Sequence, residues 1–199
     1  MFDIEYSRDL KEDAVSWCQG RNWPLRALLI LALAYMGVQH ALSDDAYDIF
    51  QGLTLAIHEA GHVIFRIFNN EPIIVAGGSI TQLAGPIALG VSFLHQRDYY
   101  AIGVAGSWLS YSMYGMAAYM ADARAQVLPL VSLGGGGDVI HDWNYLFSLW
   151  GVLPLDTTIA QVVRVLAFLV LCISLTLSTW CCCQMAKSPK SSISEYHPH

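Results

Sequence analysis

Long runs of apolar residues are the feature that most limits how this chain can fold. PLRALLILALAYMGVQHAL (24–42) and IAQVVRVLAFLVLCISLTLSTW (159–180) each match a membrane-spanning helix, which needs about 20 mostly apolar residues. The chain is 55% hydrophobic and 13% charged, whereas soluble domains are about 45–50% apolar and about 25% charged. We therefore predict an integral membrane protein that has the lipid bilayer as a partner.

Four further segments complete the expected set of membrane crossings: 49–68, 83–95, 99–120 and 126–155. The last is apolar at both ends but is interrupted by the four glycines at 134–137. Irregular backbone is not tolerated where it faces lipid, so this segment is expected to be broken or re-entrant. The predicted fold class is an all-α polytopic membrane protein with about six transmembrane segments.

The segment IIVAGGSITQ (73–82) predicts a short insert of a different kind. Two apolar runs that flank Gly77 and Gly78 are typical of a β-hairpin. Such a hairpin offers an edge to which an unwound substrate segment can add as a strand.

The distribution of charge predicts the organisation of the chain and its orientation. Residues 1–23 form an N-terminal segment, 24–183 a single transmembrane domain, and 184–199 a polar tail that is expected to be disordered. Basic residues precede or open the first crossing, while the loop SDDAYD that follows it carries three aspartates. This asymmetry predicts a multi-pass protein with a cytoplasmic N-terminus. The net charge of -6 disfavours a nucleic-acid partner.

The five cysteines do not form a recognisable metal or disulfide pattern. Their number is odd and no CxxC pair occurs, which disfavours both a disulfide framework and a cysteine zinc site. Cys181, Cys182 and Cys183 close the last apolar segment. Two interpretations stay open for this run, namely S-acylation at the membrane edge and small apolar residues at a helix end.

The strongest chemical signal is HEAGH, residues 58–62, in the middle of the apolar segment 49–68. On a helix, His58 and His62 lie one turn apart on one face, so both imidazoles can reach one tetrahedral ion. Glu59 then stands beside the ion, where it can take a proton from water activated by the metal. This is the H-E-x-x-H pattern of zinc hydrolases. The alternative is a buried, hydrogen-bonded His-Glu-His cluster that joins helices.

A catalytic zinc ion usually has three protein ligands, so a third ligand is expected elsewhere in the chain. We favour Asp142, with His141 and Asp138 as alternatives, because these residues follow the glycine-rich break. Helix N-capping would also explain one of the two aspartates. His141 can instead support the site through a ligand. The remaining histidines of the apolar part, His40 and His95, lie at the ends of expected crossings.

HEAGH in an apolar helix, a hairpin-like insert, QLAGPIAL (82–89) and a distant aspartate together resemble the site-2 protease family of intramembrane zinc metalloproteases. The resemblance covers residues 50–155 and implies one Zn2+ per chain, bound by His58, His62 and Asp142, with Glu59 as the general base. Two positions depart from the family. Leu89 replaces its usual asparagine, and GDVIHDWN replaces its LDG motif. There is also no room for the PDZ or CBS domains that many members carry.

The function that the resemblance implies is hydrolysis of a peptide bond in a membrane-embedded protein substrate. Residues 24–183 would then be a metalloprotease-like domain. The alternatives are another zinc hydrolase, a catalytically silent metal-containing membrane subunit, and a transporter whose broken helix lines the path. The oligomeric state is not indicated by the sequence.

Overall fold

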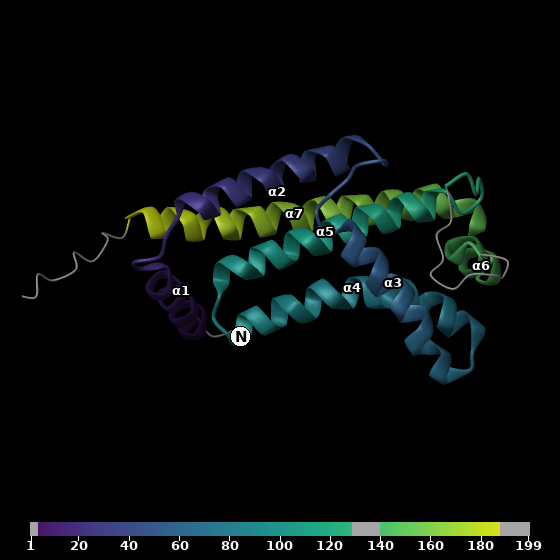
Figure 1. The fold of residues 1–199 in the computed structure, drawn as a ribbon, viewed down its shortest axis with the longest axis horizontal. Coiled ribbons are helices and arrows are strands. Elements are labelled where there is room, and N and C mark those ends of the chain that lie inside the picture. The colour runs from purple at the N-terminus through teal and green to yellow at the C-terminus, as the bar shows by residue number, and fades with distance from the viewer. Residues whose placement is uncertain (1–3, 129–139, 188–199) are drawn as a thin grey trace, which may run out of the picture.

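The computed structural model describes residues 4–128 and 140–187, and within these residues all regular secondary structure is helical. The helices are α1 (Ile4–Cys18), α2 (Pro24–Leu42), α3 (Gln51–Phe65), α4 (Glu71–His95), α5 (Tyr99–Ala121), α6 (Asp142–Leu149) and α7 (Asp156–Lys187), with 3-10 turns at Arg66–Phe68 and Leu153–Leu155. The helical fold class is therefore confirmed for the described residues. Helix α7 runs the length of the bundle, and its last residues extend into the expected tail (Figure 1).

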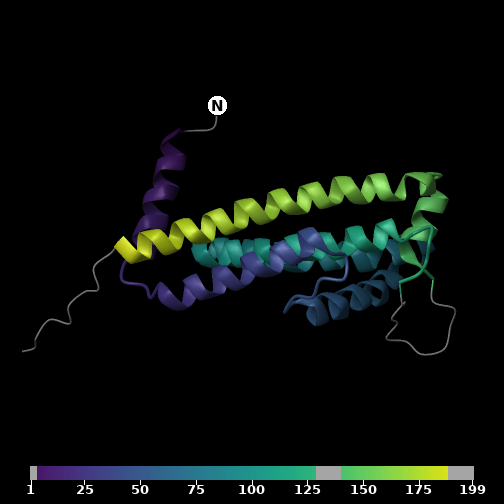
Figure 2. The same cartoon turned by 90° about the horizontal axis from the view of Figure 1, so that it is seen from above.

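Helix α5 lies inside the bundle, beside α7 in both cartoon views (Figures 1 and 2). The two helices approach closely because Gly103 and Gly106 of α5 face serines of α7. A Cβ atom at Gly103 would collide with Ser178, and one at Gly106 would collide with Ser174. Small residues are what such close helix packing requires. The central position of α5 matters below, because one of its faces also lines the candidate site.

Three helical segments of the described chain are long and apolar enough to cross a membrane: Pro24–Leu42, Glu71–His95 and Leu153–Lys187. They are consistent with a membrane protein, but the expected six crossings are not supported. Helix α3 has only 15 residues. Helix α5 has 23 residues but does not reach the apolarity of the other three, because serines and tyrosines interrupt it. The described part of 126–155 contains only the eight-residue helix α6 and a 3-10 turn.

The β-hairpin expected at 73–82 is wrong, because these residues lie inside α4. The chain turns at Asn69, whose φ of 45° is left-handed, and α4 then begins at Glu71. The side chain of Asn70 caps the new helix by accepting the N–H of Ile73 at 3.3 Å, and Pro72 occupies the first turn. Asparagine and proline are both typical of a helix start. The crossing expected at 83–95 is the second half of the same helix.

The glycines of α4 serve helix packing rather than a turn. A Cβ atom at Gly61 of α3 would collide with the backbone of Gly77 on α4, and one at Gly77 would collide with the side chain of Phe65 on α3. Thr81 of α4 adds a hydrogen bond from its hydroxyl to the carbonyl of Ile57 on α3, at 3.1 Å. A glycine inside a helix costs about 1 kcal/mol relative to alanine. The contact with α3 offsets that cost and fixes how the two helices sit against each other.

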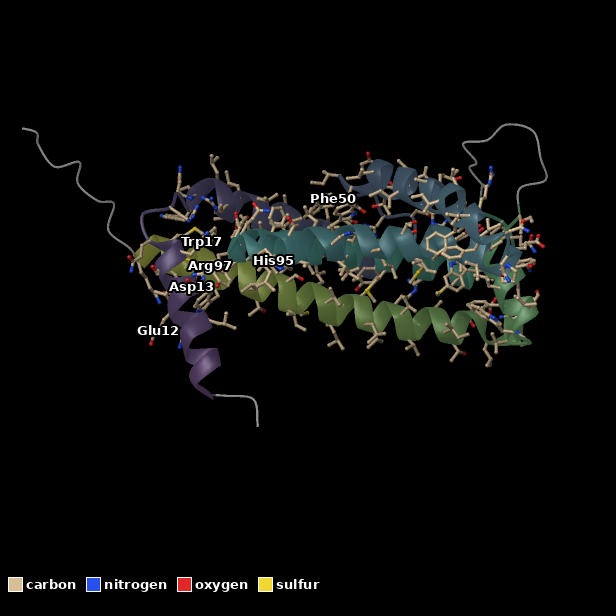
Figure 3. All side chains as sticks on the ribbon, turned by 90° about the horizontal axis from the view of Figure 1, so that it is seen from below. Glu12, Asp13, Trp17, Phe50, His95 and Arg97 are labelled. Carbon is tan, nitrogen blue, oxygen red and sulfur yellow. The ribbon has the colours of Figure 1, made fainter. Side chains whose placement is uncertain are left out.

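Helix α1 crosses the end of α7 at a steep angle (Figure 2). In Figure 3, Asp13 of α1 faces Arg97 of the α4–α5 turn, and the two form an ion pair of 2.6 Å. Cys18 of α1 and Cys181 of α7 are fully buried at this junction, and Cys182 is also buried. Of the cysteine run, only Cys183 is exposed. An acyl group on Cys181 would therefore require α1 to separate from α7.

Candidate metal centre

Helix α3 carries both histidines of the motif on its face toward α4. His58 is buried and His62 is half-buried, and their rings stand edge to face with centroids 4.8 Å apart. This is the arrangement expected for residues four apart on a helix. The local sequence therefore sets the separation of the two imidazoles, and the packing of α3 on α4 sets what they face.

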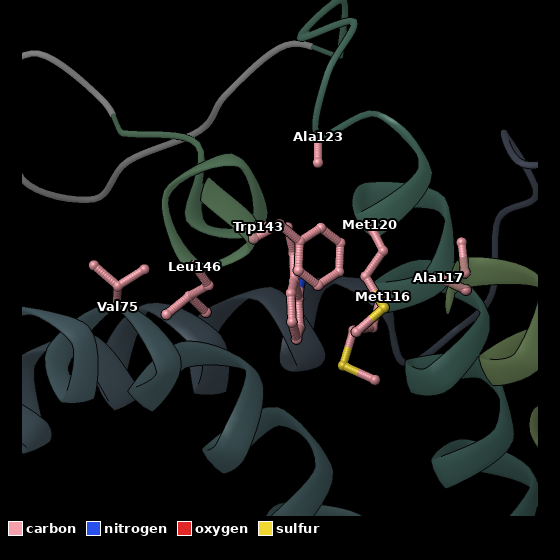
Figure 4. Close-up of a cluster of buried hydrophobic side chains, with 9 residues drawn as sticks. Val75, Met116, Ala117, Met120, Ala123, Trp143 and Leu146 are labelled. Carbon is pink, nitrogen blue, oxygen red and sulfur yellow. The ribbon is translucent and has the colours of Figure 1, made fainter. Parts of the chain in front are cut away.

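Helix α6 places Asp142 beside these histidines, although Asp142 is 84 residues from His58 in the sequence. Figure 4 shows how α6 is held: Trp143 lies against Met116 and Met120 of α5, and Leu146 points toward Val75 of α4. These side chains belong to one buried apolar cluster. Asp142 is the first residue of α6, so the same packing that buries Trp143 places its carboxyl group beside α3.

Three ligand atoms meet at this point. His58 Nε2 is 3.0 Å from Asp142 Oδ2, and His62 Nε2 is 3.3 Å from the same oxygen. The two Nε2 atoms are 3.1 Å apart. Ligands that bind zinc at about 2.0–2.1 Å in a tetrahedral arrangement stand about 3.3 Å from one another. The three atoms thus form one face of a zinc-sized tetrahedron. Within residues 4–128 and 140–187, this is the only group of three or more histidine, cysteine, aspartate or glutamate side chains that could hold a metal ion.

The other nitrogen of each imidazole is used by a hydrogen bond that fixes where its proton lies. His62 Nδ1 is 2.9 Å from the carbonyl oxygen of Ile74, which only accepts, so Nδ1 carries the proton. His58 Nδ1 is 2.9 Å from Gln82 Oε1. The amide of Gln82 is oriented by its Nε2, which donates to the carbonyl of Ser112 at 2.9 Å. His58 Nδ1 is therefore also the donor, and the Nε2 atom of each imidazole faces Asp142.

The electrostatics of Asp142 reinforce this convergence. Burial favours the neutral acid, but hydrogen bonds and charge interactions with His58 and His62 favour the carboxylate more, and together they hold the pKa of Asp142 below its ordinary value. Two Nε2 atoms and one carboxylate oxygen then face one another at 3.0–3.3 Å. Such a group is stable only with a cation among its atoms, either a proton or a metal ion. The donor set of two imidazoles and one carboxylate fits zinc.

The Gln82 contact gives a first testable prediction. The Gln82→Met variant removes the acceptor for His58 Nδ1, so we expect zinc affinity to fall about 10–100-fold, as is typical when an outer partner of a ligand is lost. The Gln82→Glu variant keeps an acceptor for that N–H and serves as the matched control. Competition with a chromogenic chelator measures both affinities. Equal zinc affinity in Gln82→Met and wild type would show that this hydrogen bond does not support the site.

Gly78 forms the wall of the site on the α4 side. A Cβ atom at this position would stand 2.5 Å from His62 Nε2 and 2.6 Å from His58 Nε2. Contacts below 3.0 Å are essentially never made by real Cβ atoms. The absence of a side chain at Gly78 thus leaves the space into which both Nε2 atoms point.

Glu59 lies on the wall of a cavity of about 750 Å³ that also contains the three ligand side chains. Ser79 and Ser112 line the same cavity, and their hydroxyl oxygens are buried without a hydrogen-bond partner among the described residues. The general base expected from the motif is therefore placed in a space that has room for a substrate and polar groups to contact it.

Of the two alternative ligands, His141 lies within the described residues but outside this cluster. His141 caps α6, because its Nδ1 accepts the N–H of Asn144 at 3.2 Å, and its Nε2 lies 3.4 Å from Asp122. Burial lowers the pKa of His141 below its ordinary value, so the imidazole is neutral. Asp138 lies outside the described residues.

The two remaining histidines of the described residues have partners of their own. His40 lines the cavity but pairs with Asp48 at 2.9 Å. His95 is exposed, and its Nδ1 is 2.8 Å from the carbonyl of Val91. Leu89, at the position of the family's asparagine, is 39% exposed on α4 and does not line the cavity.

The sequence patterns do not identify several residues of the site, namely Ile74, Gly78, Gln82, Ser112 and Tyr119. A signal for two of them was present, because NNEP marks a helix start and the small residues Gly77, Thr81 and Gly85 recur every four positions. A helix over 71–95 would have placed Gly78 and Gln82 on one side, next to α3.

Comparisons with protein-family models, with curated proteins and with solved structures find no match to this chain.

Proposed function

We propose that this chain is a multi-pass membrane zinc metallohydrolase with a cytoplasmic N-terminus, and specifically an intramembrane metalloprotease of the site-2 type. The observation that carries the proposal is the meeting of His58 Nε2, His62 Nε2 and Asp142 Oδ2 at 3.0–3.3 Å, with both Nδ1 protons directed elsewhere. The three apolar helices long enough to cross a membrane support the setting. The HEAGH motif supports the reaction class.

The residues divide the chemistry between them. His58, His62 and Asp142 would hold one zinc ion, which supplies Lewis-acid polarisation of the scissile carbonyl and makes a water molecule more acidic. Glu59 accepts a proton from that water as its oxygen bonds to the carbonyl carbon. When the C–N bond breaks, Glu59 returns the proton to the leaving amine, so the products are a carboxylic acid and an amine.

The number of protein ligands favours a catalytic role over a purely structural one. Structural zinc sites are closed by four protein ligands, whereas catalytic sites use three and leave one position open. In the described residues the cluster contains three ligands, and the cavity beside it is lined by Glu59. A catalytically silent subunit needs neither the open position nor the carboxylate. The substrate that we propose is a transmembrane protein segment, unwound where it enters this cavity.

The third ligand is tested by two variants. Asp142→Asn removes the anionic oxygen but keeps the size of the side chain, so we expect zinc affinity to fall by more than the roughly 10–100-fold typical of an outer partner. His141→Asn keeps a good helix cap and removes the imidazole, so zinc binding is expected to persist. Zinc per chain is measured on purified protein by mass spectrometry. Retention of zinc in Asp142→Asn together with its loss in His141→Asn would make His141 the ligand.

Activity is tested with a defined probe. The probe is a single-pass reporter with about 20 apolar residues, a helix-breaking proline at their centre and a fluorescent tag at each end, cleaved in detergent by the full-length chain. Wild-type protein is expected to bind zinc and to cut the reporter, and a chelator is expected to stop both. Zinc without cleavage would favour a silent metal-containing subunit, and protein without zinc would overturn the proposal.

A further inference from the structure

Tyr119 lies between α5, α6 and the candidate metal centre. Its ring packs on His141, with centroids 4.1 Å apart. Its hydroxyl oxygen accepts the backbone N–H of Asp142 at 3.1 Å. The side chain lines the same cavity as Glu59 and the ligands. Tyr119 is thus hydrogen-bonded to the residue that supplies the third ligand, and it lines the cavity in which a substrate would lie.

The proton of this hydroxyl is available for a further hydrogen bond. A phenol has one O–H donor and also accepts, and at neutral pH it keeps its proton. The bond from Asp142 uses a lone pair of the oxygen and leaves the proton free to donate. Among the described residues, no acceptor for this proton is found. Because Tyr119 borders the cavity, an acceptor inside the cavity is within its reach.

The carboxylates and imidazoles of the site cannot fill this role. The carboxylates of Glu59 and Asp142 accept hydrogen bonds but do not donate them. The Nδ1–H groups of His58 and His62 donate hydrogen bonds to Gln82 and to the carbonyl of Ile74. Peptide hydrolysis builds negative charge on the carbonyl oxygen, and donors aimed at that charge are a large source of rate enhancement. The neutral hydroxyls of Ser79, Ser112 and Tyr119 line the cavity, and among them Tyr119 is the one hydrogen-bonded to the backbone of Asp142.

We propose that Tyr119 is a further catalytic residue, which donates a hydrogen bond from its hydroxyl to the carbonyl oxygen of the substrate as that oxygen becomes anionic. This inference rests on the proposed function, because it needs a hydrolytic reaction at the same site. It identifies a group that the H-E-x-x-H motif does not contain. No covalent bond to Tyr119 is made or broken, and its proton stays on the phenol throughout.

The test compares Tyr119→Phe with Tyr145→Phe. Tyr119→Phe keeps the ring against His141 and loses only the hydroxyl, while Tyr145→Phe makes the same change on α6 at a residue that does not line the cavity. For Tyr119→Phe we expect kcat on the reporter to fall about 10²–10³-fold with little change in KM. Zinc affinity is expected to stay near the wild-type value. Tyr145→Phe should behave as wild type in all three measurements.

A binding measurement separates this role from a structural one. A phosphinic peptide carries a tetrahedral, anionic centre and so resembles the transition state, and such analogues bind tightly where transition-state contacts exist. We expect its affinity for Tyr119→Phe to fall in parallel with kcat, while the affinity of the uncut reporter does not. Parallel losses of zinc affinity and kcat would overturn the proposal, because Tyr119 would then act only by positioning Asp142.

The remaining outcomes keep the two proposals apart. Wild-type protein that lacks zinc and cleavage would overturn the proposed function itself. Wild-type protein that cleaves, with Tyr119→Phe equally active, would overturn only the role of Tyr119. A fall in kcat in Ser79→Ala or Ser112→Ala, with Tyr119→Phe unaffected, would transfer the role to one of the two buried hydroxyls of the cavity.

Discussion

Replacing Glu59 with glutamine is expected to lower cleavage of the transmembrane reporter about 10²–10⁴-fold, the range that a general base contributes, and to leave one zinc ion on each chain. The amide of glutamine has nearly the same shape as the carboxylate but cannot accept a proton from water. Glu59 is not one of the three residues whose ligand atoms meet at the candidate metal centre. Zinc content and kcat, measured on the same preparation, check both halves of the expectation.

A matched control for this variant lies on α4. Glu71→Gln makes the same chemical change at an exposed position in the first turn of that helix, outside the cavity, and is expected to cleave as wild type. Cleavage that survives in Glu59→Gln would show that the carboxylate is not the base. Loss of zinc in that variant would show that Glu59 supports the metal rather than the reaction.

The Gly78→Ala variant is expected to abolish both zinc binding and cleavage. The new Cβ atom would lie 2.5 Å and 2.6 Å from the two Nε2 atoms, so the imidazoles must turn away and their Nε2 atoms no longer meet at Asp142. Alanine is a better helix former than glycine by about 1 kcal/mol, so α4 itself is not weakened. Zinc per chain, cleavage and the midpoint of thermal unfolding are measured together.

Gly90→Ala on the same helix is the control for this variant. A Cβ atom there would lie 3.8 Å from the Cβ of Ala105, an ordinary van der Waals contact, so zinc binding and cleavage should not change. Normal zinc affinity in Gly78→Ala would mean that the two histidines hold the metal at a place other than the one their Nε2 atoms now face.

Much of the candidate site could be predicted from sequence because it depends on local geometry. An α-helix places residues four apart on one face wherever it occurs, so HEAGH by itself sets His58 and His62 side by side. Apolar runs of the length of 24–42 and 159–180 likewise predict membrane helices without any knowledge of their neighbours. The position of Asp142 after the glycine-rich break favours it as the third ligand, and the structure brings it to the two histidines.

The hairpin prediction failed because glycine is ambiguous when its surroundings are not known. A pair such as Gly77 and Gly78 suits a tight turn, since glycine tolerates unusual backbone angles. It also suits a helix that must approach another closely, since glycine has no Cβ atom. Only the presence of Gly61 and the two histidines on α3 decides between the two. The count of crossings failed because α3 has only 15 residues and because serines and tyrosines interrupt the apolar residues of α5.

By itself, the sequence determined the apolar character of the chain, its helical class and the spacing of the two histidines beside Glu59. Each of these follows from composition or from the repeat of one helix. Only the tertiary structure decided which groups meet them: Asp142, 84 residues from His58, the carbonyl of Ile74, the amide of Gln82 and the hydroxyl of Tyr119. The physical reason is that these meetings depend on how α3, α4, α5 and α6 bury their faces against one another, which no single helix specifies.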